Sequence, residues 1–107
     1  MTLKGNTMQP QITLDEAKGV VTTKTAPKVT EESIKAKIAS VDFFRPDDTY
    51  LVICAITMKN GFTFVGKAAP ASPENFDYAV GTRYSYEDAF KQIWSHEGYL
   101  LREQLSN

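Results

Sequence analysis

Apolar side chains occupy almost every position of residues 50–58, which is the strongest strand signal in the chain. Successive side chains of a strand point to opposite faces of the sheet. One face carries Tyr50, Val52, Cys54, Ile56 and Met58, and the other carries Leu51, Ile53 and Ala55. Because both faces are apolar, we expect a central strand that is covered on both sides. Asn60-Gly61 then favours a tight hairpin, so residues 62–67 are predicted to return antiparallel.

The preceding segment predicts a helix followed by a first strand. Thr30 is a suitable N-cap for a helix that ends near Ala39, and two glutamates occupy its first turn. Ile34 and Ile38 lie four residues apart, on one face of that helix. Residues 41–44 then resemble a strand that ends at Pro46 and an Asp47-Asp48 turn.

The C-terminal third predicts two helices. Ser72-Pro73 begins a short helix that Gly81 ends, because glycine is the preferred residue just past a helix C-terminus. Ser85 is the expected N-cap of a long second helix, with Asp88 as its weaker capping-box partner. Apolar residues recur along this helix near the helical period: Ala89, Phe90, Ile93, Trp94, Tyr99, Leu101 and Leu105.

These elements predict an α+β fold, with a three-stranded antiparallel sheet, an N-terminal helix and two C-terminal helices. Residues 29–107 form the single domain, and residues 1–28 form a weakly structured arm. Within the arm, Thr13 caps a short helix that Gly19 ends, and residues 20–23 favour extended structure. Because these helices cover only one face of the sheet, we expect a homo-oligomer that assembles through its sheet and helix surfaces.

Composition excludes several classes of function. A formal net charge of -1 argues against bulk electrostatic binding to DNA or RNA. A single cysteine cannot form an internal disulfide, so a reducing cytoplasm is the expected compartment. The chain has no apolar stretch of membrane-spanning length, and we expect no membrane partner.

Candidate catalytic groups are few. Cys54 and His96 are the only cysteine and the only histidine, and Cys54 lies in the middle of the apolar strand. A thiol in that position is typical of a structural residue. No His, Cys, Asp or Glu residues have metal-ligand spacing, and the scattered glycines form no phosphate-binding loop. We therefore expect no enzyme activity, no metal and no cofactor.

Aromatic residues beside arginines are the best candidates for ligand binding. Arg83 and Tyr84 are predicted in a loop between the two helices, close to Phe76 and to a helix N-terminus, which suits phosphate binding and ring stacking. Near the chain end, Gly98 leaves a gap beside Arg102 and Tyr99 provides a wall. A buried Phe76 and solvated arginines remain the alternative. The candidate ligand-binding residues are Phe76, Arg83, Tyr84, Ser85, Asp88, Tyr99 and Arg102.

Several motifs together carry a resemblance to a known family. They are Val41-Asp42-Phe43-Phe44, Lys59-Asn60-Gly61-Phe62, Asn75-Phe76-Asp77, Tyr86-Glu87-Asp88-Ala89, Ile93-Trp94 and Glu97-Gly98-Tyr99-Leu100-Leu101-Arg102. With them the chain resembles, from Val29 to Leu105, a family of small tailed-phage proteins that includes the first type of Thoeris anti-defence protein. The resemblance implies a sponge that binds cyclic ADP-ribose isomers without cleaving them, in the cytoplasm of the infected bacterium.

The resemblance also implies an assembly. Some members of that type capture cyclic di- or trinucleotides at separate sites of a larger oligomer, so a dimer or a hexamer built as a trimer of dimers is expected. The alternative is a phage protein that binds and inhibits a host protein through its exposed aromatic surface. A small enzyme such as a phosphodiesterase is the third hypothesis.

Overall fold

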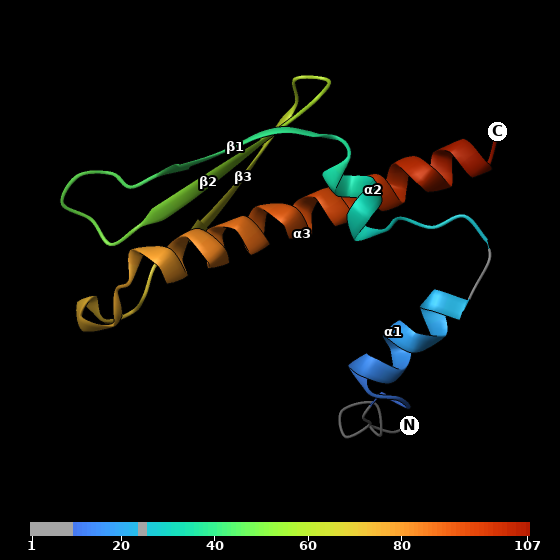
Figure 1. The fold of residues 1–107 in the computed structure, drawn as a ribbon, viewed down its shortest axis with the longest axis horizontal. Coiled ribbons are helices and arrows are strands. Elements are labelled where there is room, and N and C mark those ends of the chain that lie inside the picture. The colour runs from blue at the N-terminus through green and yellow to red at the C-terminus, as the bar shows by residue number, and fades with distance from the viewer. Residues whose placement is uncertain (1–9, 24–25) are drawn as a thin grey trace, which may run out of the picture.

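The computed structural model describes residues 10–23 and 26–107. Its elements follow the order α1 (Leu14–Thr23), α2 (Glu31–Lys35), β1 (Ile38–Phe44), β2 (Val52–Met58), β3 (Thr63–Ala68), a 3-10 turn η2 (Pro73–Asn75) and α3 (Tyr78–Leu105). The three strands form an antiparallel sheet in the order β1-β2-β3, and α3 runs along one face of it (Figure 1). The predicted α+β class and the three-stranded sheet are confirmed.

The core lies between β2 and α3. The β2 side chains alternate between buried and half-buried, and the buried ones are Val52, Cys54, Ile56 and Met58. Cys54, Ile56 and Met58 pack in one cluster with Phe64 of β3 and with three residues of α3, Ala89, Phe90 and Ile93. The predicted central position of β2 is confirmed. Cover on its second face is not found in the described chain, because the outer face leaves Phe44 55% and Val65 54% exposed.

The Asn60-Gly61 hairpin forms as predicted. Gly61 adopts a positive φ of 92°, which glycine accommodates without a steric penalty. The backbone N–H of Phe62 donates to the Asn60 side-chain oxygen at 2.9 Å, an arrangement typical of asparagine in turns. This local chemistry sets the register in which β3 pairs with β2.

Helix α2 begins where it was predicted to begin and ends early. Thr30 caps it through a reciprocal capping box with Ser33, and Ile34 is completely buried. The predicted continuation to residue 39 is wrong, because Ile38 already pairs with Met58 as the first residue of β1. A five-residue helix has few internal hydrogen bonds, so the strand pairing of a β-branched residue prevails.

The two predicted C-terminal helices are a single helix. Asp77 caps α3 by accepting the Val80 N–H at 3.0 Å, and only the turn η2 precedes it. Gly81 lies inside α3, so its predicted role as a stop is wrong. A Cβ at Gly81 would lie 2.6 Å from Cγ2 of Val52. This glycine therefore serves close packing of the helix on β2.

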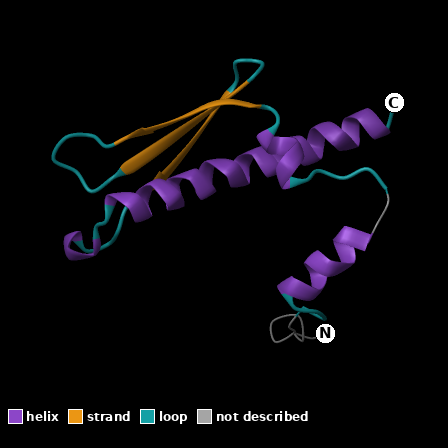
Figure 2. Cartoon of the chain, in the orientation of Figure 1, coloured by secondary structure: helices purple, strands orange, loops and turns teal. Residues whose placement is uncertain are grey.

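Helix α1 lies apart from the sheet and α3 (Figure 2). Thr13 and Glu16 form a capping box at its start, as predicted for Thr13. The predicted end at Gly19 and the extended structure after it are wrong, because α1 continues to Thr23. Residues 1–9 and 24–25 of the predicted arm lie outside the described residues. The division of the chain at residue 28 stays a prediction.

Candidate functional site

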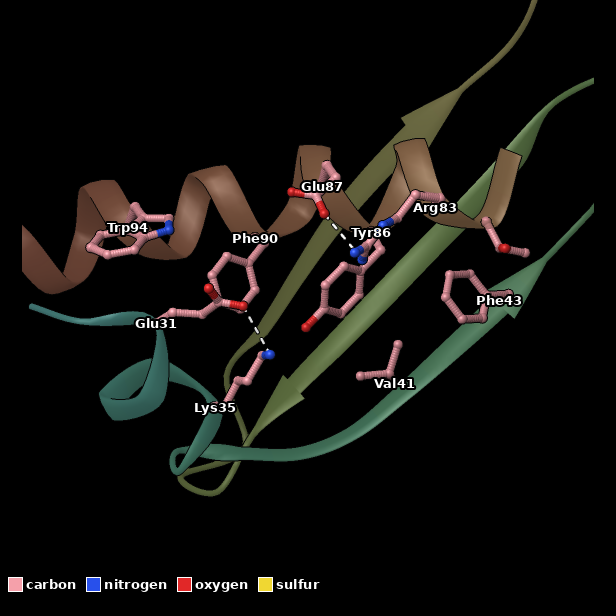
Figure 3. A pocket seen from close by; sticks show the side chains of 10 residues that line it. Glu31, Lys35, Val41, Phe43, Arg83, Tyr86, Glu87, Phe90 and Trp94 are labelled. Carbon is pink, nitrogen blue, oxygen red and sulfur yellow. Dashed lines mark ion pairs between the residues drawn. The ribbon is translucent and has the colours of Figure 1, made fainter. Parts of the chain in front are cut away.

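A cleft lies beside the edge strand β1. Helix α3 packs against β2 and β3, so the side chains of β1 that face the helix extend past it. Between β1, α2 and α3 a cleft of about 620 Å³ opens (Figure 3). Its lining residues are Glu31, Lys35, Val41, Phe43, Thr82, Arg83, Tyr86, Glu87, Phe90 and Trp94. We call it the β1 cleft.

One wall of the β1 cleft is a ladder of aromatic rings. Tyr86, Phe90 and Trp94 follow one another at intervals of four along α3, which places them on one helix face. The ring centroids of Tyr86 and Phe90 are 5.5 Å apart, and those of Phe90 and Trp94 are 6.4 Å apart. Across the cleft, Phe43 points from β1 toward α3 (Figure 3). Trp94 is 40% exposed and Phe43 37%, so both offer ring surface to a ligand.

The rim of the β1 cleft carries two ion pairs. Nη1 of Arg83 lies 3.1 Å from Oε2 of Glu87, and Nζ of Lys35 lies 2.8 Å from Oε2 of Glu31. The hydrogen bond from Lys35 lowers the pKa of Glu31, and the same bond raises the pKa of Lys35. All four side chains are exposed, so water screens the attraction between their charges and both pairs are weak. An anionic ligand can therefore displace Glu87 or Glu31 at little cost.

Phe76 lies in a different place from Arg83. It precedes α3 and lines a second cavity, of about 520 Å³, together with Tyr84. The guanidinium carbon of Arg45 lies 4.3 Å from the centroid of the Phe76 ring, and the Tyr50 ring meets it edge-on at 5.5 Å. The predicted loop for Arg83 and Tyr84 is wrong, since both lie on α3. As neighbours on a helix they face different cavities.

Ser85 and Asp88 have structural positions. Ser85 is completely buried inside α3, and its hydroxyl donates to the Thr82 carbonyl at 3.1 Å, so its predicted role as a helix N-cap is wrong. Oδ2 of Asp88 accepts the backbone N–H of Lys67 in β3 at 2.9 Å. Its predicted capping-box role is wrong for the same reason, since α3 does not begin there.

Tyr99 and Arg102 lie on the last turns of α3, and neither lines the clefts described here. Tyr99 is 72% exposed, and the predicted open space beside Gly98 is present, because a Cβ there would meet nothing within 4 Å. Arg102 lies about 28 Å from Arg83 along the helix axis, since an α-helix rises about 1.5 Å per residue. One small ligand cannot reach both arginines of the same chain.

Cys54 and His96 do not form a nucleophile–base pair within one cleft. Burial, with a smaller effect of Asp42, raises the pKa of the Cys54 thiol to about 11, which makes it a poor nucleophile. His96 lines a third groove, of about 490 Å³, where its ring packs edge-on against Phe64 at 5.0 Å. In the described part of the chain, no three His, Cys, Asp or Glu residues are grouped to hold a metal ion.

The residues of the ring ladder were not among those predicted to bind a ligand. The helical spacing predicted an apolar face that includes Phe90 and Trp94; Phe90 does pack in the core, whereas Trp94 is 40% exposed. The signal that identifies the ladder is the four-residue spacing of three aromatic side chains, where aliphatic residues suffice for a core. Phe43 carried no comparable signal, because its exposure depends on how far β1 extends past α3.

These observations define a small α+β domain whose exposed clefts are lined by aromatic rings and by weakly paired cations. The chain belongs to the Phage protein (N4 Gp49/phage Sf6 gene 66) family, whose model matches residues 29–105. The predicted resemblance to a phage protein family is thereby confirmed. Comparison with curated proteins and with solved structures gives no match. In residues 10–23 and 26–107, no helix is both long and apolar enough to span a membrane.

Proposed function

We propose that this phage protein is an anti-defence sponge, which binds cyclic ADP-ribose-type immune signals and holds them without cleavage. The observation that supports it best is the ring ladder of Tyr86, Phe90 and Trp94 beside Arg83. An adenine ring stacks on an aromatic side chain with about 1–3 kcal/mol per base, whatever its substituents. The resemblance to the first type of Thoeris anti-defence protein leads to the same ligand class.

The rim cations suit the pyrophosphate of such a ligand. Arg83 lies 5.7 Å from the centre of the Tyr86 ring, so a base stacked on the ladder brings its phosphates near the guanidinium. A guanidinium binds phosphate oxygens through two parallel hydrogen bonds. Lys35 approaches from α2 on the other side of the cleft (Figure 3). In this scheme, the carboxylates of Glu87 and Glu31 give up their ion pairs and become solvated when the ligand binds.

The proposal includes that the bound ligand is held and not cleaved. The thiol of Cys54 has a raised pKa and lies in the core, away from the exposed rings. His96 lines another groove, where its Nδ1 lies 3.0 Å from the Gln92 carbonyl oxygen. The ladder itself consists of aromatic side chains, which offer a stacking surface and no strong nucleophile.

A homo-oligomer in the host cytoplasm completes the proposal. Arg102 and Phe76 remain candidates for ligand contacts, but Arg102 lies too far from Arg83 to share a ligand within one chain. A site between two copies of the chain removes that conflict. The exposed outer face of the sheet supports association, in a dimer or a trimer of dimers. Cyclic di- or trinucleotides are proposed as further ligands of such an assembly.

A capture experiment tests the proposed function. The protein is incubated with a cyclic ADP-ribose isomer, separated from free ligand and heat-denatured, and the released nucleotide is analysed. We expect intact ligand from the wild-type protein and at least tenfold weaker capture by Trp94→Leu, which removes one ring. Tyr78→Leu is the matched control, because Tyr78 is an exposed ring on α3 that lines none of the described clefts. A cleaved product would indicate an enzyme.

The alternative function is binding and inhibition of a host protein. It is favoured by the apolar outer face of the sheet, where Phe44, Ile53 and Val65 lie without a helix above them. Absence of nucleotide capture, together with loss of host-protein binding in a Val65→Lys variant, would establish this alternative.

A further inference from the structure

The two edges of the sheet differ in how their backbone groups are satisfied. Two side chains of α3 cover the edge of β3. Asp88 accepts the N–H of Lys67 at 2.9 Å, and Nε2 of Gln92 donates to the carbonyl oxygen of Val65 at 2.7 Å. Asp88 and Gln92 lie four residues apart, so one face of α3 occupies this edge. A further strand cannot pair there without displacing them.

The edge of β1 has no such cover. Along an antiparallel strand, the N–H and C=O groups of alternate residues point to opposite sides. Lys59 donates to the carbonyl of Lys37, so residues 53, 55, 57 and 59 direct their backbone groups toward β1. Their partners in β1 include Asp42 and Phe44. The backbone groups of Val41 and Phe43 therefore point away from the sheet, and no hydrogen bond from elsewhere in the described chain reaches them.

We propose that β1 of a second copy pairs antiparallel with this open edge, about a two-fold axis, to form a continuous six-stranded sheet. The strand is self-complementary, since the outward N–H of one copy meets the outward C=O of the other. With the β3 edges covered, the strand pairing stops at two copies instead of growing into a fibre. This pairing specifies the dimer of the proposed function and requires no bound nucleotide.

The pairing also completes the β1 cleft. Val41 and Phe43 both line that cleft and carry the backbone groups of the open edge. The second copy's β1 therefore lies along the rim of the cleft, and the clefts of the two copies lie side by side. The side chain of Asp42 lies on the outer face, and pairing centred on it would oppose two like charges. The axis is consequently expected at Val41 or at Phe43.

Cysteine cross-linking tests the pairing and its register. At the two-fold axis the same residue of both copies lies about 5.5 Å apart between Cα atoms, within the range for a disulfide. We expect Val41→Cys or Phe43→Cys to form a disulfide-linked dimer on oxidation, visible on a non-reducing gel. The wild-type Cys54 is buried and should not cross-link. Val65→Cys, on the covered edge, is the matched control, and equal cross-linking there would overturn the proposal.

A proline variant provides a second readout. Val41→Pro removes one outward N–H and leaves the β1–β2 hydrogen bonds intact, as proline permits at a strand edge. Light scattering should give twice 11.9 kDa for the wild type and 11.9 kDa for the variant, with cooperative melting in both. A wild-type monomer, or an unchanged dimer in the variant, would contradict edge pairing. Both experiments are carried out without nucleotide. A negative result would therefore contradict the strand pairing and not the proposed binding of cyclic ADP-ribose.

Discussion

Gly66 of β3 lies directly against the backbone of Ala89 in α3. A Cβ on Gly66 would overlap the Ala89 nitrogen and the carbonyl oxygen of Ser85. The helix thus reaches the sheet with backbone against backbone, and Gly81, Ser85 and Ala89 keep that face of α3 small at intervals of four. This close approach places Asp88 and Gln92 within hydrogen-bonding distance of the β3 edge.

Gly66→Ala should destabilise the protein strongly. The added methyl group meets helix backbone, which cannot move aside as a flexible side chain does, so we expect a loss of about 1–3 kcal/mol or more in the free energy of unfolding. Gly98→Ala is the control, because nothing lies within 4 Å of its Cβ position. Helix propensity should make that variant about 0.5–1 kcal/mol more stable. Urea denaturation checks both, and equal stability of the two variants would refute this packing.

Stability should decline at alkaline pH because of Cys54. Burial raises the thiol pKa from 9.0 to about 11, so the unfolded chain loses this proton before the folded protein does. The contribution of the thiol is fully present below about pH 9 and is lost as the pH rises toward about 11. Melting temperatures at about pH 8 and about pH 10.5 should differ more for the wild type than for Cys54→Ala. Identical differences would show that the thiol titrates normally.

Arg45 and Phe76 should be energetically coupled. The guanidinium carbon lies 4.3 Å from the ring centroid, so part of the Phe76 surface is occupied before any ligand arrives. A double-mutant cycle with Arg45→Ala and Phe76→Ala should give a coupling of about 0.5–1 kcal/mol in the free energy of unfolding. If Phe76 instead acts only in ligand stacking, the cycle will give no coupling and Phe76→Ala will lose capture without melting earlier.

Removing the cover of the β3 edge should cause further assembly. In an Asp88→Ala, Gln92→Ala variant, the backbone groups of Lys67 and Val65 lose their partners and become available to another strand. We expect species larger than the wild type in light scattering, increasing with protein concentration. Lys91→Ala, an exposed substitution between the two positions, should leave the mass unchanged. A double variant with the wild-type mass would show that α3 shields this edge by other means.

The fold was predictable where the relevant chemistry is local. The alternation of β2 and the Asn60-Gly61 turn identify the hairpin, because both signals lie within a few residues. The glycines misled the prediction, since glycine ends helices in many sequences and here Gly81 accommodates Val52, a residue of a distant strand. Ser85 resembled an N-cap because serine often caps helices, whereas here its small side chain is buried inside α3. A small residue can end a helix or allow the helix to pack closely on a sheet. Which of the two occurs depends on the residues of the neighbouring strand.

The site was predictable only in part. Arg83 and Phe76 were both predicted to bind a ligand and both line cavities, but Arg83 lies on α3 and Phe76 precedes it, and they line different cavities. The helical spacing of the aromatic residues was visible, whereas the exposure of Trp94 and Phe43 was not. That exposure arises because α3 packs against β2 and β3 and leaves β1 beyond it. The lateral position of a helix on a sheet is not encoded in one local pattern.

Arg83 and Arg102 should complement each other between subunits if one ligand contacts both. Within a chain they lie about 28 Å apart, so a shared site takes one arginine from each copy. Arg83→Ala alone and Arg102→Ala alone should each capture at least tenfold less ligand, as should Arg102→Lys, because an ammonium does not reproduce the planar fork. A mixing experiment tests whether the site is shared. When Arg83→Ala and Arg102→Ala chains are unfolded, mixed in equal amounts and refolded, half of the dimers contain one chain of each variant. Each such dimer has one site with both arginines intact. Capture should then recover to about a quarter of the wild-type capacity. Normal capture by both Arg102 variants would leave Arg83 as the phosphate contact of a site within one chain. The mixture would then capture only the average of what the two variants capture separately.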